Sequence, residues 1–250
     1  MRAGAGGMTR GGIIVLAAGG GVAPTPVQFK VNQAIGGSTT KAITFDSSVT
    51  NGNLIVVGVG GFLSNRNDVT LTAAMLTKTA GTSTVGTVQI DRESGRTDTD
   101  DDNPIAIFSV PVTGSGTLTL TLDISSIAGD SNFWMIGGVE YSGADVSGTR
   151  VNASNSANTS TNTTVSSGNV ATGGAGIIFG VMVPGNPYGA ITNTPDGAFT
   201  EYETDEDDDP VNSGIIARVV SADTTDAAEW GLGTSSSWAA VAVAYKSSTP

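Results

Sequence analysis

From Val27 onward, apolar residues alternate with polar residues or run together over five to nine positions, and Gly, Asn, Asp, Ser or Pro separate the runs. A period of two residues is typical of β-strands, and these separators are typical of turns. The sequence contains no convincing amphipathic helix. The pattern therefore predicts an all-β fold in which short strands are joined by turns.

Two of the predicted strands are apolar on both faces, so we expect them inside a sheet. One covers residues 53–61 and the other residues 238–245. Residues 117–123 alternate almost perfectly, which predicts one solvated face. Because no helical crossovers separate the strands, we expect an antiparallel β-sandwich, jelly-roll-like in its connections. The predicted strands cover residues 27–31, 42–45, 53–61, 69–73, 85–91, 105–110, 117–123, 133–141, 176–183, 199–203, 215–220 and 238–245.

The domain organisation predicted from composition is one sandwich domain, residues 27–250, behind a Gly-rich N-terminal arm, residues 1–26. The arm contains a short apolar stretch, residues 13–18, which is shorter than the core of a secretory signal peptide, so a flexible or partner-bound arm is favoured. Residues 142–175 are rich in Ser, Asn, Thr and Ala, and this composition fits a linker, a sheet edge or a solvated hairpin.

The 250 residues include no His and no Cys. Without imidazole or thiol, the common zinc sites and the Cys- or His-based nucleophilic arrangements cannot be built. We therefore predict that the chain is not an enzyme and needs no cofactor.

Eleven basic residues against 23 acidic ones give a net charge of −12, which would repel a nucleic acid. No apolar run approaches the length of a membrane helix, so we expect no nucleic acid and no membrane as partner.

Most acidic residues fall in two segments, which we expect to be solvated loops. Carboxylates in such runs also suit hard cations such as calcium, although neither run has the order of an EF-hand. The candidate ligands are Asp100, Asp102, Asp205 and Asp207. A cation is favoured only if the two loops meet.

Aromatic and acidic residues supply the remaining candidates for a site. Core packing is the favoured role for Trp134 and Trp238, whereas Trp230 is expected in a connection. Tyr188, with Asn186 in the same predicted turn, is the best candidate for a loop that contacts a ligand such as a glycan. A carboxylate pair of the kind that glycosidases use could be formed by Glu140 with Glu201 or Glu203, but solvent-facing strand positions explain these residues more simply.

Three core-strand patterns carry a resemblance: GNLIVVGV (52–59), WMIGGVEYSG (134–143) and WAAVAVAY (238–245). Over residues 27–246 the chain resembles β-sandwich domains of bacteriophage virion proteins, such as fibres and capsid decoration proteins. The resemblance implies a structural protein that forms a homo-oligomer, commonly a homotrimer, and it carries over no catalytic residue.

The leading interpretation is a decoration or cement protein on the exterior of a phage virion, bound to the major capsid protein or another virion protein. Its expected anchors are Ile13, Ile14, Val15 and Leu16 in the arm. The alternatives are a receptor- or carbohydrate-binding fibre domain, a self-assembling bacterial surface or filament subunit, and a sandwich enzyme that acts on glycosides.

Overall fold

The computed structural model describes residues 21–34, 38–64, 69–97, 101–128, 132–185, 191–192, 198–204 and 213–249. Within these residues the chain is almost entirely β-structure, and every strand pairing is antiparallel. The one helical element among them is a short 3-10 turn, η1 (Ala73–Met75). The predicted fold class, an all-β antiparallel sandwich, is confirmed.

The strands form two large sheets and one small sheet. The first sheet has the order β1 (Thr25–Ala34), β9 (Asn132–Ser142), β3 (Leu54–Ser64), β7 (Asp101–Gly114) and β5 (Thr84–Val85), and β6 (Gln89–Thr97) also pairs with β7. The second sheet has the order β10 (Val151–Ala171), β15 (Thr225–Lys246), β11 (Gly176–Pro184), β14 (Gly214–Val220) and β13 (Thr200–Thr204), and β12 (Ile191–Thr192) also pairs with β15. The small sheet has the order β2 (Thr40–Thr44), β8 (Thr119–Asp123) and β4 (Leu76–Ala80). The finer prediction of jelly-roll-like connections is not confirmed by this order.

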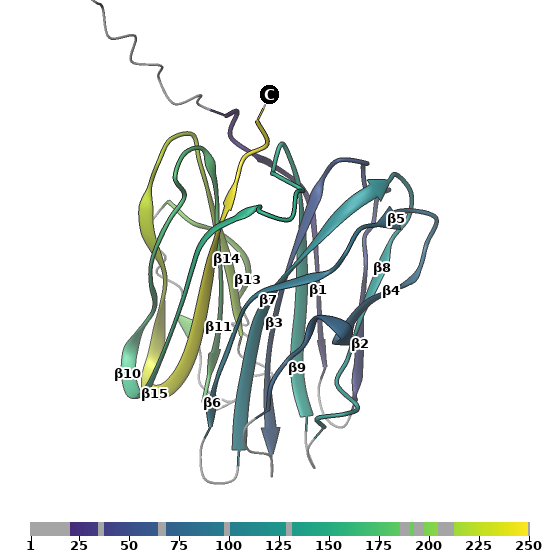
Figure 1. The fold of residues 1–250 in the computed structure, drawn as a ribbon. Coiled ribbons are helices and arrows are strands. Elements are labelled where there is room, and N and C mark those ends of the chain that lie inside the picture. Colours follow the sequence, from purple (N-terminus) through teal and green to yellow (C-terminus); the bar gives the residue numbers. More distant parts are fainter. Residues whose placement is uncertain are drawn as a thin grey trace, which may run out of the picture.

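The first sheet is the middle layer of the molecule (Figure 1). One of its faces packs against the small sheet through residues such as Phe108, Trp134 and Leu120, and the other packs against the second sheet through residues such as Ile107, Phe179 and Val241. Each apolar face is removed from water in this way, which is the main favourable contribution to folding. Strand β3 is buried on both faces, as predicted from its apolar run.

Close contact between the two large sheets depends on a pair of glycines. Gly58 and Gly137 lie opposite each other in neighbouring strands. A Cβ atom at Gly58 would lie 2.6 Å from Val181 of the second sheet, and one at Gly137 would clash with Ile215. Because Gly58 and Gly137 have no side chains, Val181 and Ile215 can fill the space between the two sheets.

The long strands β10 and β15 form a ribbon that bends back on itself. Residues 151–159 of β10 pair with residues 238–245 of β15 in the second sheet, whereas residues 164–171 pair with residues 225–231, and the register shifts between the two halves. The second half covers the outer face of the second sheet, where Trp230 packs over Gly180 and Gly214. This folded half is visible at the left of Figure 1.

This ribbon decides between the interpretations of segment 142–175 and corrects one expectation. Of the linker, the sheet edge and the solvated hairpin, the sheet edge is confirmed, because most of the segment forms the 21-residue strand β10 at the end of the second sheet. Its partner β15 is far away in sequence. Trp230 is 1% exposed and lies within β15 rather than in a connection. Ser, Asn and Thr are tolerated in β10 because its solvent face needs no apolar side chains.

Other strand predictions differ in detail. Residues 69–73 form no strand; η1 begins at Ala73, and β4 follows it. Strand β1 begins at Thr25, two residues before its predicted start, and β8 begins at Thr119, two residues after its predicted start. The predicted strand 85–91 is divided between β5 and β6, and β15 begins at Thr225, well before its predicted start at Trp238. Trp134 and Trp238 are buried, as predicted. In β15, Trp238 and the even-numbered alanines face the outer core, while Val241, Val243 and Tyr245 face the first sheet, which confirms the predicted pair of faces.

Candidate functional site

Edge strands of all three sheets meet on one side of the molecule. Strands β1, β2 and β13 each stand at the end of their sheet. Side chains of β1 contact residues of β2 and the turn after it, and Phe29 of β1 contacts Tyr202 of β13. We call this side the β1 edge surface. Edge strands present unpaired peptide groups, so they are where a sheet can pair with another chain.

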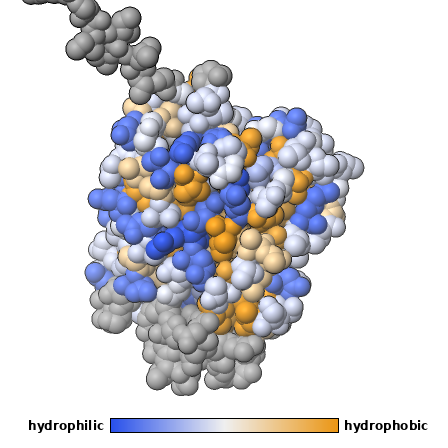
Figure 2. Space-filling view, viewed as in Figure 1, coloured by the Kyte–Doolittle hydropathy of each residue, from blue (hydrophilic) through white to orange (hydrophobic). Residues whose placement is uncertain are grey.

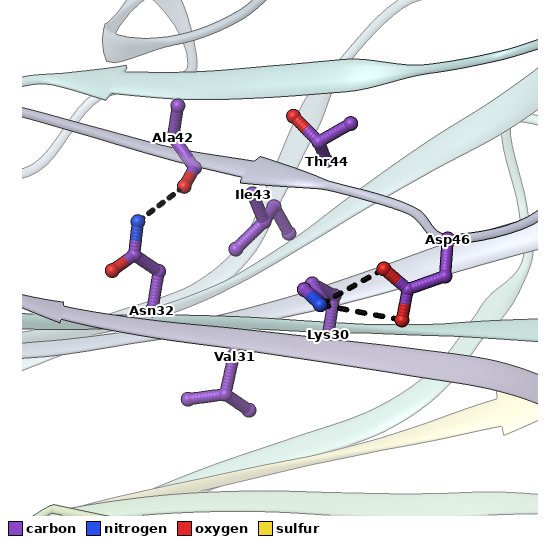
Figure 3. Close-up of a pocket in the computed structure, with 7 residues that line it drawn as sticks. All are labelled: Lys30, Val31, Asn32, Ala42, Ile43, Thr44 and Asp46. Carbon is purple, nitrogen blue, oxygen red and sulfur yellow. Dashed lines mark hydrogen bonds and ion pairs between the residues drawn. The ribbon is translucent and has the colours of Figure 1, made fainter.

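The polar face of β1 closes the edge of the small sheet, as Figure 3 shows. The Nδ2 atom of Asn32 donates a hydrogen bond of 2.6 Å to the carbonyl oxygen of Ala42, and the Nζ atom of Lys30 lies 2.9 Å from the Asp46 carboxylate. Together they line a depression of about 430 Å³. The ion pair is exposed, so it contributes little stability, but the Asn32 bond occupies a carbonyl that would otherwise be free for another chain.

The opposite face of β1 is apolar and partly open. Val27 is 51% exposed and Phe29 is 53% exposed, although both lie in β1, Val27 at the register shift between Pro26 and Gln28. The Phe29 ring lies 5.5 Å, centroid to centroid, from the half-buried ring of Tyr202. Val31 points the same way but lies deeper, against the backbone of Gly137. The β1 edge surface thus combines an unpaired strand edge with exposed apolar side chains.

Two tyrosines lie behind this apolar face. Burial raises the pKa of Tyr141 well above the ordinary phenol value, and the neighbouring Tyr202 adds to the effect. Burial also raises the pKa of Tyr202. Both phenols are therefore neutral at physiological pH, and the surface carries no phenolate that would repel an apolar partner.

Glu140 is a buried structural carboxylate, which corrects the expectation of a solvent-facing position, and the structure does not place it beside Glu201 as the glycosidase alternative requires. Its Oε1 atom accepts hydrogen bonds from the Thr50 amide (2.8 Å) and from Asn53 Nδ2 (2.7 Å), and its Oε2 atom accepts one from Gln28 Nε2 (2.6 Å). Glu140 is fully buried and lies on the face of β9 turned to the small sheet, whereas Glu201 is exposed on β13 in the second sheet. The first sheet separates them. The side chain of Glu203 lies outside the described residues.

The residues predicted to form sites fall almost wholly outside the described part of the chain. They are Ile13, Ile14, Val15, Leu16, Asp100, Asn186, Tyr188, Asp205 and Asp207. Asp102 belongs to β7, opposite Leu63, but its side chain is likewise outside the described residues. Among the side chains that are described, no group of three or more carboxylates could hold a metal ion.

Sequence reasoning missed both the β1 edge surface and the role of Glu140. One signal was present: residues 27–32 read Val-Gln-Phe-Lys-Val-Asn, in which apolar and polar residues alternate perfectly. The alternation indicates a strand with two different faces, but it does not show that the strand is at an edge.

A second buried polar cluster joins the two large sheets at their other side. The Tyr245 hydroxyl donates a hydrogen bond of 2.6 Å to Asp91, and Arg150 Nε donates one of 2.7 Å to the Ser109 hydroxyl. Burial raises the pKa of Asp91, while hydrogen bonds from Ser109 and Tyr245 and the charge of Arg150 oppose this shift. The cluster thus places the charges of Asp91 and Arg150 beside the mainly apolar contact between the two large sheets.

The raised pKa of Asp91 predicts a pH dependence of stability. Between its ordinary value of 3.8 and the raised value, the folded chain holds a proton that the unfolded chain has lost, so the contribution of Asp91 to the free energy of unfolding falls as pH rises. We expect Asp91→Asn to remove this fall, as measured by urea denaturation between about pH 4 and pH 7. Asp46→Asn, at an exposed position, is the control. Identical pH slopes for Asp91→Asn and the wild type would contradict the prediction.

Comparison of the chain with protein-family models, with curated proteins and with solved structures gives no match. Within the described residues, the structure has no helix of the length and apolar character needed to cross a membrane.

Proposed function

We propose that this chain is a non-enzymatic structural protein that associates with copies of itself through the β1 edge surface. The observation that carries the proposal is the exposure of Val27 and Phe29 on a strand that has β9 on one side and no described strand on the other. Exposed apolar residues on an unpaired edge promote pairing between chains. The neighbouring edge of β2 is already capped by Asn32, so of these two adjoining edges β1 is the one that remains available.

The chemistry of β1 suits antiparallel pairing with β1 of a second copy. With a twofold axis at Phe29, the two Phe29 rings lie opposite each other, and Gln28 lies opposite Lys30. Apolar residues thus meet apolar ones, and the single charge faces an amide. An axis at Lys30 would place two ammonium groups opposite each other, so it is disfavoured. Pro26 and the register shift before Gln28 limit the paired segment at its start.

The finer proposal follows the resemblance in the core strands. We propose a decoration or cement protein on the exterior of a phage virion, with the major capsid protein or another virion protein as its partner. The proposed self-association through the β1 edge surface suits this role. A protein that binds a capsid lattice in many copies gains stability from each contact with a neighbouring copy of itself. A twofold contact at β1 gives dimers rather than the trimer expected from the resemblance.

The absence of cysteine makes the contact testable by cross-linking. Strands paired antiparallel hold opposite Cα atoms about 4.5–5.5 Å apart, within reach of a disulfide. We expect Phe29→Cys to form a covalent dimer under mild oxidation, measured by non-reducing electrophoresis, and light scattering of the unmodified chain to show an even-numbered oligomer.

Lys30→Cys is the matched control, because its side chain points to the other face and does not lie opposite its own copy. It should cross-link much more slowly than Phe29→Cys. A monomer by light scattering, together with equal cross-linking of the two variants, would contradict the proposed contact. A trimer without Phe29 cross-links would show that the chain associates through another surface.

A further inference from the structure

A second depression lies at the other edge of the first sheet, away from the β1 edge surface. It has a volume of about 270 Å³ and is formed by the approach to β6, the end of β7 and the loop before β10. Its lining residues are Gly86, Thr87, Gln89, Pro111, Thr113, Val146, Gly148 and Arg150. We call it the Arg150 cleft. Its size is below the range of pockets for drug-sized ligands, so it suits a single small ring.

Arg150 is only 2% exposed although it lines this cleft. Its Nε atom bonds to the Ser109 hydroxyl, one Nη atom bonds to the Ser147 carbonyl oxygen at 2.8 Å, and the other lies 3.5 Å from the Ser109 carbonyl oxygen. A guanidinium has five N–H groups, so two have no acceptor among the described residues. A buried donor that lacks a partner is costly, and a ligand in the cleft could supply one.

The charge balance of the cleft favours a neutral ligand. The nearby Asp91 carboxylate interacts with the Arg150 charge, so the site has little net charge to attract an anion. The net charge of −12 on the whole chain also repels anions. Thr87, Thr113 and Gln89 carry groups that both donate and accept hydrogen bonds. Hydroxyl groups on a ligand have the same dual character.

The cleft also has a small apolar part, which a purely polar ligand would not use. Pro111 lines it, together with Val146, which is 36% exposed. A sugar ring presents C–H groups on its faces and hydroxyl groups around its rim, so it matches both kinds of lining. We propose that the Arg150 cleft binds one neutral monosaccharide unit of a glycan, held by Arg150 N–H groups and by the threonine and glutamine side chains.

The test uses Gly148 to fill the cleft without disturbing the fold. A Cβ atom at Gly148 would meet no atom within 4 Å, so Gly148→Trp should fold and block the cleft, while Gly148→Ala should leave it open. Wild type and both variants are first applied to a glycan array. Glucose, galactose, mannose and glucuronate are then titrated, and the chemical shifts of the arginine Nε–H and backbone amide groups are followed by NMR.

We expect at least one neutral hexose to shift the Arg150 Nε–H signal and the amides of Thr87 and Gly148. Gly148→Trp should weaken binding at least tenfold, and Gly148→Ala should leave it unchanged. Three outcomes would overturn the proposal: no response to any sugar, equal binding by Gly148→Trp and the wild type, or a preference for glucuronate. Unfolding curves of the three proteins establish that the fold is intact. Phe29→Cys cross-linking does not involve the Arg150 cleft, so this test and that of the proposed function fail independently.

Discussion

A chain that ends at Ser237 is expected not to fold, because it lacks an interior strand segment of the second sheet. Residues 238–246 lie between β10 and β11, with pairing on both sides. Residues 238–245 are buried, and their two faces contribute to two different cores. Burial of each large side chain contributes about 1.5–3 kcal/mol. Loss of Trp238, Val241, Val243 and Tyr245 together therefore approaches the whole stability of a typical domain.

The control for this experiment is a chain that ends at Ser248, which keeps the backbone hydrogen bonds of Ser247 and Ser248. It should unfold cooperatively in a thermal melt followed by circular dichroism. The shorter chain should be insoluble or show no cooperative transition. Soluble, cooperatively unfolding protein ending at Ser237 would contradict the prediction, because it would show that the fold forms without residues 238–246 of β15.

Replacing Glu140 with Ala is expected to lower the free energy of unfolding by about 3 kcal/mol. The carboxylate is the common acceptor for a backbone amide and two side-chain amides, and its removal takes the acceptor from the buried Asn53 side chain and from the part-buried Thr50 amide. Its bond from the Thr50 amide holds the turn around residues 47–53 against β9, and Gln28, which donates to Glu140, exchanges hydrogen bonds with the Ser47 backbone and so joins the turn to β1. The loss therefore affects both the small sheet and the β1 edge surface.

Urea denaturation of three variants tests this role. Glu140→Gln keeps one acceptor oxygen but brings an NH2 group toward a donor, so we expect an intermediate loss. Glu229→Ala, at an exposed position of β15, should change stability by no more than about 0.5 kcal/mol. Stability of Glu140→Ala equal to that of the wild type would mean that water replaces the carboxylate without cost.

Local pattern predicted the strands well where one or both faces are apolar. Residues 53–61 and 238–245 were recognisable because their side chains are buried on both sides, and residues 119–123 because theirs alternate. Strand β10 was ambiguous for the opposite reason. Its Ser, Asn and Thr residues give no periodic apolar signal, and its pairing with β15 is visible only in the assembled sheet.

The candidate sites were much harder to predict than the strands. Predicting the β1 edge surface requires knowing that β1 lies at the end of its sheet. Predicting the Arg150 cleft requires knowing that residues from three separate segments converge. Glu140 illustrates the same point, since its three donors come from residues 28, 50 and 53. A carboxylate next to Tyr141 in a sequence gives no indication that it will be buried with three partners.

The sequence alone determined the fold class, the approximate strands and which side chains face a core, because a period of two residues assigns alternate side chains to opposite faces of a strand. The tertiary structure decided the strand order, the folded ribbon of β10 and β15, the open edge of β1 and the position of Arg150 beneath its cleft. These features depend on contacts between residues far apart in the chain. No local pattern specifies such contacts, because they form only when complete sheets pack against one another.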